Sequence, residues 1–262
     1  MKWTILASGS GGNTTYLESN GVKLLIDCGI TYRQITTRLK AHNHSIDPLD
    51  AVLITHEHGD HIKGLDVTMK RHNATTYMTK DTYDGLPWRV KDNVDPTKIE
   101  IITPYEPFFI NHLKITPISI SHDASDAVGY VIEDEDKKLV YVTDIGYLPK
   151  RDYELFTGAD AYIFESNYDV TMLFTSSRPF YLKQRIDSVK GHMSNNDSAY
   201  NLAQLVRTNT KYIILAHRSR ECNTDELVLQ TYQDVFADYG LTLSDYEVCV
   251  AKQDIPTKLF KL

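Results

Sequence analysis

The sequence predicts a layered α/β fold, built as one domain over residues 1–262. Apolar, β-branched runs of strand length alternate with amphipathic runs of helix length, which is the pattern of stacked sheets and helices. The chain is 42% hydrophobic, and its 262 residues can bury one large core. No linker or low-complexity run interrupts it. Two similar halves, each with strands followed by helices and divided near residues 110–160, would therefore form one sandwich.

The overall composition limits the possible functions. The net charge is −7 and the pI is near 5.8, which argues against tight non-specific binding to long nucleic acid, because such binding needs a basic face. A small substrate or the end of a chain fits this charge better. No apolar stretch spans a membrane, and the first residues lack the pattern of a secretory signal. Three scattered cysteines suggest reduced thiols rather than disulfides, so we expect a cytoplasmic protein.

The chain opens with three predicted strands, at residues 3–7, 14–18 and 23–27. A glycine-rich loop at 8–13 separates the first two, and Asn20-Gly21 is a hairpin signal between the last two. No helix follows the glycine-rich loop directly, so a turn near the site is a better interpretation than a phosphate-binding loop.

Asp27 closes the third strand, and it is either a turn residue or an acceptor for a ligand histidine. Cys28 after it is interpreted as packing. Residues 31–42 have the spacing of an amphipathic helix, with Ile35 and Leu39 on the apolar side.

The stretch Thr55-His56-Glu57-His58-Gly59-Asp60-His61 is the strongest functional signal. It directly follows the apolar run 51–54, a predicted buried strand, so it lies on a strand-to-helix turn. Such a turn can direct His56 and His58 to one metal ion and Asp60 and His61 to a second, with Gly59 allowing the tight backbone. The alternative is a solvated polar turn. Four potential ligands at this spacing after a core strand favour the metal site.

Four later strands also end in polar residues that could bind a metal or a substrate. The predicted strands at 115–120, 138–142, 161–164 and 212–216 are followed by His122, Asp144, Glu165 and His217, respectively. His122 alone is more simply a loop histidine, and Asp144 alone a turn residue. Their repeated position at strand ends raises the probability of a shared site.

The remaining elements are a helix at 64–72, a short strand at 75–78, and helices at 194–206 and 223–239. Ser194 is the expected N-cap of the helix at 194–206. Leu227, Leu229 and Val235 are expected to face the core from the helix at 223–239. The segment 82–107 is either a rim of the active site or a surface excursion.

Taken together, the ordered set Asp27, His56-x-His58-x-Asp60-His61, His122, Asp144 and His217 resembles the metallo-β-lactamase superfamily. The stretches 6–10, 164–169, 191–195 and 217–221 resemble its WalJ/YycJ-type phosphodiesterases, which are related to ribonuclease Z and to phage anti-Pycsar enzymes. The resemblance implies an αββα sandwich of two mixed sheets flanked by helices, with two metal ions in the cleft.

The resemblance also implies a role for each site residue. His56, His58 and His122 would hold one ion, Asp60, His61 and His217 the other, and Asp144 would bridge them. A shell of imidazoles and carboxylates without a thiolate suits two Zn²⁺ ions, with Mn²⁺ as the alternative. Two such ions support in-line attack on phosphorus, and Asp60 would orient the attacking water.

His192, in Gly191-His192-Met193-Ser194-Asn195, is by itself a residue flanking a helix start. In ribonuclease Z-like enzymes the matching histidine stabilises the phosphate or protonates the leaving oxygen. Glu165 would pair with it and favour the form that donates a proton.

Several functions follow as hypotheses. The first is a phosphodiesterase, acting either as a 5′ to 3′ exonuclease on DNA ends or as a hydrolase of 3′,5′-cyclic mononucleotides. The alternative is a carbon-centred hydrolase of the lactamase or thioesterase type, which needs no phosphate-facing histidine at position 192. A third hypothesis is that the metal ions only stabilise the fold and take no part in catalysis. No long basic arm of the kind that grips tRNA is evident. The resemblance implies a homodimer, and the aromatic segment 174–181 either forms the interface or packs internally.

Overall fold

A computed structural model describes all residues from 1 to 262, and the strands form two mixed seven-stranded sheets flanked by helices. The predicted α/β fold class with two mixed sheets is therefore confirmed. The chain divides into two compact units. Unit 1 comprises residues 1–119, 124–128 and 251–262, and unit 2 comprises residues 120–123 and 129–250. That the chain behaves as a single domain stays a prediction, and each unit is described by itself.

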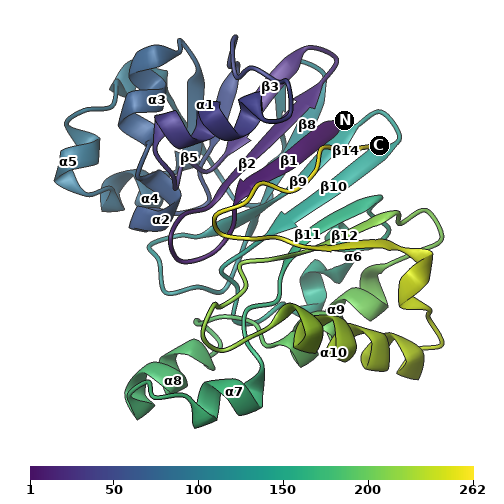
Figure 1. Ribbon diagram of the computed structural model, residues 1–262. Coiled ribbons are helices and arrows are strands. Elements are labelled where there is room, and N and C mark those ends of the chain that lie inside the picture. The colour runs from purple at the N-terminus through teal and green to yellow at the C-terminus, as the bar shows by residue number, and fades with distance from the viewer. The chain divides into compact units, whose positions relative to one another are not determined.

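Unit 1 contains a complete seven-stranded sheet. Its order is β14-β1-β2-β3-β4-β5-β6, with the bounds β1 Lys2–Ala7, β2 Thr14–Ser19, β3 Val22–Ile26, β4 Ala51–Leu53, β5 Thr75–Thr79, β6 Ile99–Ile102 and β14 Phe260–Lys261. The strands β3 to β6 run parallel, whereas β14, β1, β2 and β3 pair antiparallel. The two chain ends lie side by side because β14 pairs with β1 (Figure 1).

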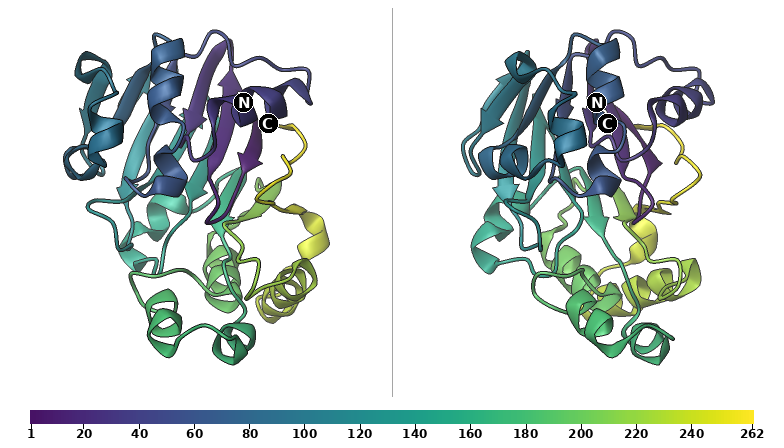
Figure 2. Two further views of the ribbon diagram at one scale, coloured as in Figure 1. Left: turned by 60° about the vertical axis from the view of Figure 1, so that its left-hand side comes forward. Right: turned by 90° about the vertical axis from the view of Figure 1, so that its left-hand side faces the viewer.

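The helices of unit 1 are short. They are α1 Tyr32–Lys40, α2 Gly59–Ile62, α3 Leu65–Arg71, α4 Lys80–Gly85, α5 Trp88–Lys91 and the 3₁₀ turn η1 Pro96–Lys98. Thr31 caps α1 through a capping box with Gln34, and Ile35 and Leu39 are fully buried, as predicted. Figures 1 and 2 show α1 and α3 over one face of the sheet, where their apolar side chains join a common core.

The predicted hairpin and strands of this unit are confirmed. Asn20 and Gly21 both have positive φ, 45° and 85°, which a two-residue hairpin turn of this kind requires. Ser19 and Val22 pair across the turn, so the register of β2 and β3 is fixed there. Unit 1 also carries the antiparallel hairpin of β7 Phe108–Ile110 and β8 Leu113–Ser119.

Unit 2 is built on strands that are mostly parallel. Their order is β13-β12-β11-β10-β9, with the bounds β9 Val128–Asp134, β10 Lys137–Val142, β11 Ala161–Glu165, β12 Tyr212–Ala216 and β13 Glu247–Val250. The four strands β10 to β13 are parallel neighbours, and only β9 pairs antiparallel. Their carboxyl ends therefore meet at one edge of the sheet, which is where ligands of such sheets bind.

The helices of unit 2 are η2 Lys150–Asp152, α6 Tyr153–Phe156, α7 Val170–Thr175, α8 Phe180–Ile186, α9 Asn195–Leu205, α10 Asp225–Asp238 and η3 Leu243–Asp245. Ser194 caps α9 by accepting from the backbone N–H of Asp197, as predicted. The helices α9 and α10 pack against each other (Figure 1).

The prediction of which residues of the last helix, α10, are buried was wrong at two positions. Leu227 and Leu229 are 38% and 37% exposed. The buried side chains are instead Val228, Tyr232, Val235 and Phe236. These four follow the helical spacing i, i+4, i+7 and i+8, so they share one stripe that the two leucines cannot join.

Candidate metal centre

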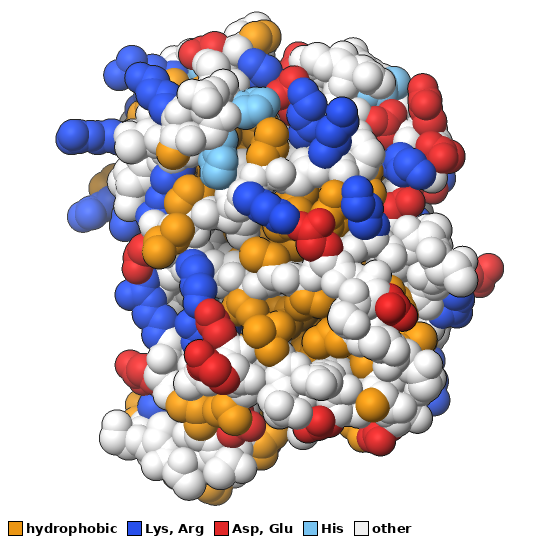
Figure 3. Space-filling model, turned by 45° about the vertical axis from the view of Figure 1, so that its right-hand side comes forward, with side chains coloured by type: hydrophobic (Ala, Val, Ile, Leu, Met, Phe, Trp, Pro, Cys, Tyr) orange, Lys and Arg blue, Asp and Glu red, His pale blue; other side chains and the backbone are white.

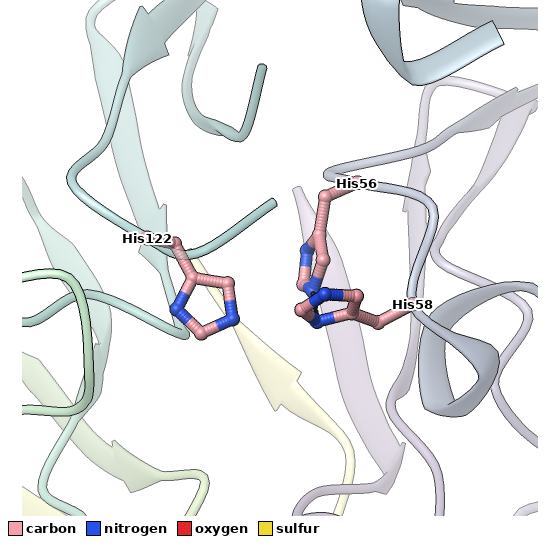
Figure 4. Close-up of side chains that lie close together, drawn as sticks. All are labelled: His56, His58 and His122. Carbon is pink, nitrogen blue, oxygen red and sulfur yellow. Dashed lines mark hydrogen bonds between the residues drawn. The ribbon is translucent and has the colours of Figure 1, made fainter. Parts of the chain in front are cut away.

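Unit 1 brings together four potential ligands on the loop after β4 and the first turn of α2. His56 and His58 extend from this loop with their rings edge to face (Figure 4), and His56 Nε2 lies 3.1 Å from His58 Nδ1. Asp60 and His61 follow on α2, and the His56 and His61 rings lie 4.0 Å apart, centroid to centroid. His56 and His61 are fully buried. The predicted cluster of ligands therefore converges at one place in this unit.

Asp27 holds His61 in position. His61 Nδ1 lies 2.7 Å from Asp27 Oδ2, and Thr55 donates to Asp27 from both its backbone N–H (2.8 Å) and its hydroxyl. Burial raises the pKa of the fully buried Asp27 carboxyl, whereas His61 and Thr55 lower it. Asp27 is thus an acceptor for His61, as one of its two interpretations expected, while the role of His61 as a metal ligand stays a prediction. Such a contact leaves Nε2 as the nitrogen directed to a metal.

The glycine-rich loop before β2 reaches the same cluster through Asn13. Asn13 Nδ2 lies 3.0 Å from His61 Nε2 and 3.3 Å from Asp60 Oδ2, and the backbone N–H of Asn13 donates to the carbonyl of Asp60. The prediction of a turn near the site is confirmed. Asn13 itself was not predicted, and its place at the end of a glycine-rich loop was the available signal.

The tight backbone of this region lies at Gly29, not at Gly59. A Cβ on Gly29 would stand 1.7 Å from the carbonyl oxygen of Asp60 and 2.4 Å from the backbone nitrogen of Asn13, so only glycine fits between α2 and the glycine-rich loop. A Cβ on Gly59 would meet nothing within 4 Å, and Gly59 has no positive φ. The role predicted for Gly59 was wrong, because the close approach comes from chain segments distant in sequence.

Unit 2 forms a second cluster at the carboxyl ends of its parallel strands. The ligand-type atoms of Asp144, Glu165, His192 and His217 all lie within 4.8 Å of one another. Asp144 follows β10, Glu165 ends β11 and His217 follows β12, and the register places Glu165 opposite Ala216. The parallel arrangement thus explains why residues 144, 165 and 217 converge. The loop before α9 adds His192.

Glu165 is shared by two histidines. Its Oε1 lies 2.8 Å from His192 Nδ1 and 3.0 Å from His217 Nδ1, and its Oε2 accepts the backbone N–H of Ile145. Burial raises the pKa of Glu165, but the attraction of His192 and the hydrogen bonds with both histidines outweigh it and hold the pKa below the ordinary value. Glu165 is therefore an anion that orients both rings.

Two further contacts complete the second cluster. His217 Nε2 lies 3.3 Å from Asp144 Oδ1, and Asn167, which the sequence argument gave no role of its own, places its amide nitrogen 3.1 Å from His217 Nδ1. His122, labelled in Figure 4, follows β8, and its Nδ1 lies 3.2 Å from the carbonyl oxygen of Gly191. Burial lowers the pKa of His122, which favours the neutral form that binds metals.

Backbone geometry marks the same residues. Asp27, Asp144 and His217 have φ values of 60°, 57° and 52°, in the left-handed region that residues other than glycine adopt rarely. Such conformations concentrate at functional sites, where the surrounding structure holds them. Asp27 and His217 directly follow β3 and β12, and Asp144 lies two residues after the end of β10, so all three lie where the chain leaves a strand.

The donor chemistry fits a divalent metal. Nδ1 of His56, His61, His122 and His217 lies within 3.2 Å of Thr55, Asp27, Gly191 and Glu165, respectively. This is the arrangement that sets the tautomer and orientation of ligand histidines. No thiolate takes part, since Cys28 packs in the core of unit 1 and burial raises its pKa well above the ordinary value. The structure therefore holds imidazole and carboxylate groups able to bind a divalent metal ion.

Known proteins resemble the chain over nearly its whole length. The sequence profile of the β-lactamase superfamily domain matches residues 23–217. The exodeoxyribonuclease WalJ of Streptococcus pneumoniae is 35% identical over 264 residues, covering 100% of this chain and 98% of that protein. The exodeoxyribonuclease YycJ of Bacillus anthracis is 31% identical, covering 99% of this chain and 98% of that protein.

A solved structure shows the same fold. The metallo-β-lactamase fold protein YhfI from Bacillus subtilis matches with a TM-score of 0.70 at 18% identity, covering 98% of each chain. At this identity the match speaks for the fold alone. Together with the sequence relatives it confirms the resemblance on which the predicted fold class rested.

Proposed function

The chain belongs to the β-lactamase superfamily and is a metal-dependent hydrolase, and from this premise we propose that it hydrolyses phosphodiester bonds at DNA ends. The direction we propose is 5′ to 3′. The observation that carries the proposal is the pair of His192 and Glu165 beside Asp144 and His217. This pair provides a proton donor next to a cluster of metal ligands, and the relatives named as exodeoxyribonucleases support DNA as the substrate.

The proposed ligands are the residues whose orientation is fixed in each unit. We assign His56, His58 and His122 to one ion, Asp60, His61 and His217 to a second, and Asp144 to both, with Zn²⁺ first and Mn²⁺ as the alternative. When bound, two such ions supply Lewis-acid polarisation of the phosphoryl oxygens and lower the pKa of water. This assignment rests on the family pattern and on the donor chemistry of each cluster.

The protein's own residues position the reactants and move the protons. Glu165 holds Nδ1 of His192, so Nε2 is the nitrogen that donates to the leaving oxygen. The Glu165 carboxylate also stabilises the charge that His192 carries before donation. In unit 1, Asn13 contacts the Asp60 carboxylate, which orients the attacking water. His192 and Asp60 are thus the proposed general acid and orienting carboxylate.

A DNA end is a better substrate than a long duplex for this surface. The net charge is −7, and the face drawn in Figure 3 mixes Lys and Arg with Asp and Glu side chains. A long duplex needs an extended basic face because each contact neutralises a phosphate. A terminal nucleotide needs only a local site.

A substrate panel tests the proposal. Purified protein loaded with Zn²⁺ or Mn²⁺ would be given single-stranded and duplex DNA with labelled 5′ or 3′ ends, RNA, cyclic mono- and dinucleotides, a β-lactam and a thioester. We expect mononucleotide release from DNA 5′ ends. If only cyclic nucleotides are hydrolysed, the protein is a cyclic-nucleotide phosphodiesterase rather than an exonuclease. Hydrolysis of the lactam or thioester without any phosphodiester cleavage would refute the proposal.

We further propose a cytoplasmic homodimer that unfolds as a single domain. Phe180 and Tyr181 on α8 are 65% and 73% exposed, which supports the segment 174–181 as an interface rather than as internal packing.

No helix is both long and apolar enough to cross a membrane, and none of the three cysteines forms a disulfide. Light scattering on wild-type protein and Phe180→Asp tests the dimer. One calorimetric transition, rather than two, tests the single domain.

A further inference from the structure

Unit 2 has a pocket beside His192, and none of the proposed metal ligands lines it. It encloses about 360 Å³ within unit 2, comparable with the smaller ligand pockets of proteins. Its walls are the loop 146–150, the start of α6, residues 187–193 and one side of α9. His192 is one of the lining residues, so the pocket opens onto the proposed proton donor.

The pocket walls carry several aromatic rings. Tyr147 and Tyr200 are 52% and 42% exposed, and Tyr153 is half-buried between them in the pocket lining. The Tyr153 hydroxyl donates to Asn201 and thereby ties α6 to α9, which lie close together in Figure 1. Burial raises the pKa of Tyr153, and the nearby Tyr147 raises it further, so the Tyr153 ring is neutral at physiological pH. Neutral, exposed rings of this kind are platforms for stacking a planar group.

The charges of the pocket decide which part of a substrate enters. Asp187 and Asp197 line it, and both are exposed carboxylates that repel a phosphate. Lys150 is the one basic side chain among the lining residues apart from His192. The amide oxygen of Gln204 offers a hydrogen bond to the edge of a neutral planar group, whereas the Asn201 amide is already bonded to Tyr153 and to the carbonyl of Asp197. A neutral ring therefore suits the interior, with the phosphate outside at His192.

The pocket is also tied to the proposed chemistry by the chain itself. Tyr147 lies three residues after Asp144, on the loop that follows β10, and Tyr200 lies on α9, which begins two residues after Met193. Both walls thus extend directly from loops that carry site residues. Because His192 also lines the pocket, a group bound here lies next to the proposed proton donor.

We propose that this pocket binds the nucleobase of the terminal nucleotide whose phosphodiester is cleaved, by stacking on Tyr147 and Tyr200. The inference rests on the proposed function and specifies its substrate. A base inside a pocket of this size cannot remain paired with a second strand. The enzyme therefore selects single-stranded or frayed ends and requires a base on the terminal nucleotide.

The test compares two single-stranded oligonucleotides that differ only in the terminal nucleotide, one with thymine and one with an abasic tetrahydrofuran. For wild-type holoenzyme the ratio of kcat/KM, thymine over abasic, is expected to be about 5 to 160, the range for stacking one base. Tyr147→Ala and Tyr200→Ala are expected to bring this ratio close to one, and Tyr147→Phe to restore it. Tyr105→Ala, in unit 1 with a ring 40% exposed, is the matched control and keeps the wild-type ratio.

The outcomes separate the two proposals. A wild-type ratio near one, with both oligonucleotides hydrolysed, overturns the base pocket and leaves the phosphodiesterase function standing. Alanine variants that lower kcat/KM for both substrates equally, or that change neither, also overturn it. If wild-type protein hydrolyses neither oligonucleotide, the proposed function fails and the pocket assignment fails with it. Denaturant unfolding of each variant checks that the fold is retained.

Discussion

Replacing Asp27 with Asn tests how the first cluster is organised. The substitution keeps the shape of the side chain, but it replaces one oxygen by an NH₂ group and removes the charge. If the amide oxygen keeps the bond from the Thr55 backbone N–H, the NH₂ group faces Nδ1 of His61. It would then donate to that nitrogen, and the ring proton would move to Nε2, the nitrogen directed to the metal.

The expected loss follows from this change of tautomer. Removing a carboxylate that orients a ligand histidine costs about 10- to 100-fold in metal affinity, or about 1.4 to 2.8 kcal/mol. The metal-free protein is expected to lose less than about 3 kcal/mol of unfolding free energy, because the lost charge-assisted hydrogen bonds are offset by the burial cost of the Asp27 carboxylate. A domain of ordinary stability remains folded after such a loss.

The assay is a competition titration, in which a chromogenic chelator of known affinity removes Zn²⁺ from each variant. Asp50→Asn is the matched control, because the Asp50 carboxylate also accepts a backbone N–H beside β4, from Lys23 at 2.7 Å, but contacts no histidine. We expect weaker Zn²⁺ binding in Asp27→Asn alone. Wild-type affinity in that variant, or an equal loss in the control, would refute the orienting role.

Four further predictions concern the ligands, the proton donor, the metal and stability. His58→Ala and Asp60→Ala are expected to lose bound metal and hydrolysis together in elemental analysis and nuclease assays, and full turnover after loss of metal would contradict the ligand assignment. His192→Ala should keep its metal while kcat on DNA falls about 10²- to 10⁴-fold, with a smaller loss on a p-nitrophenyl phosphodiester, whose leaving group needs no proton; equal slowing of both substrates would argue against proton donation. EDTA should abolish hydrolysis and added Zn²⁺ or Mn²⁺ restore it, so chelator-resistant activity would exclude the metal mechanism. Burial lowers the pKa of His72 below 6.5, although Asp47 opposes this; the unfolded chain therefore binds more protons, and stability is lost as the pH falls below about 6.5. Urea unfolding at about pH 7.5 and 5.5 should show a smaller pH effect in His72→Gln than in the wild type, and an equal effect would contradict this account.

The elements that the sequence predicted well are those determined by neighbouring residues. The helix α1 follows from the cap at Thr31 and from the spacing of Ile35 and Leu39, and the hairpin follows from Asn20-Gly21. The ligand-type residues after the strands could be recognised because a buried strand has a strong local pattern and its end is marked by the first polar residues. Local sequence was sufficient in each case.

Errors arose where a side chain depends on a partner far along the chain. Leu227 and Leu229 looked like core residues, but the stripe of α10 that packs on α9 runs through Val228 and Tyr232. The close backbone approach occurs at Gly29 rather than at Gly59, because Asp60 on α2 and Asn13 on the glycine-rich loop both lie against Gly29. The pattern of residues along the sequence shows that a helix or turn exists. It does not show which other part of the chain that helix or turn packs against.

The sequence by itself determined the main strands and helices and the residues able to bind a metal, and its resemblance to a known family gave the pairing expected between His192 and Glu165. Only the tertiary structure decided that Glu165 is shared with His217 and that Tyr147 and Tyr200 line one pocket. The reason is physical. The spacing of apolar residues records the local backbone, whereas contacts between distant residues depend on strand pairing and loop packing that the whole unit fixes together.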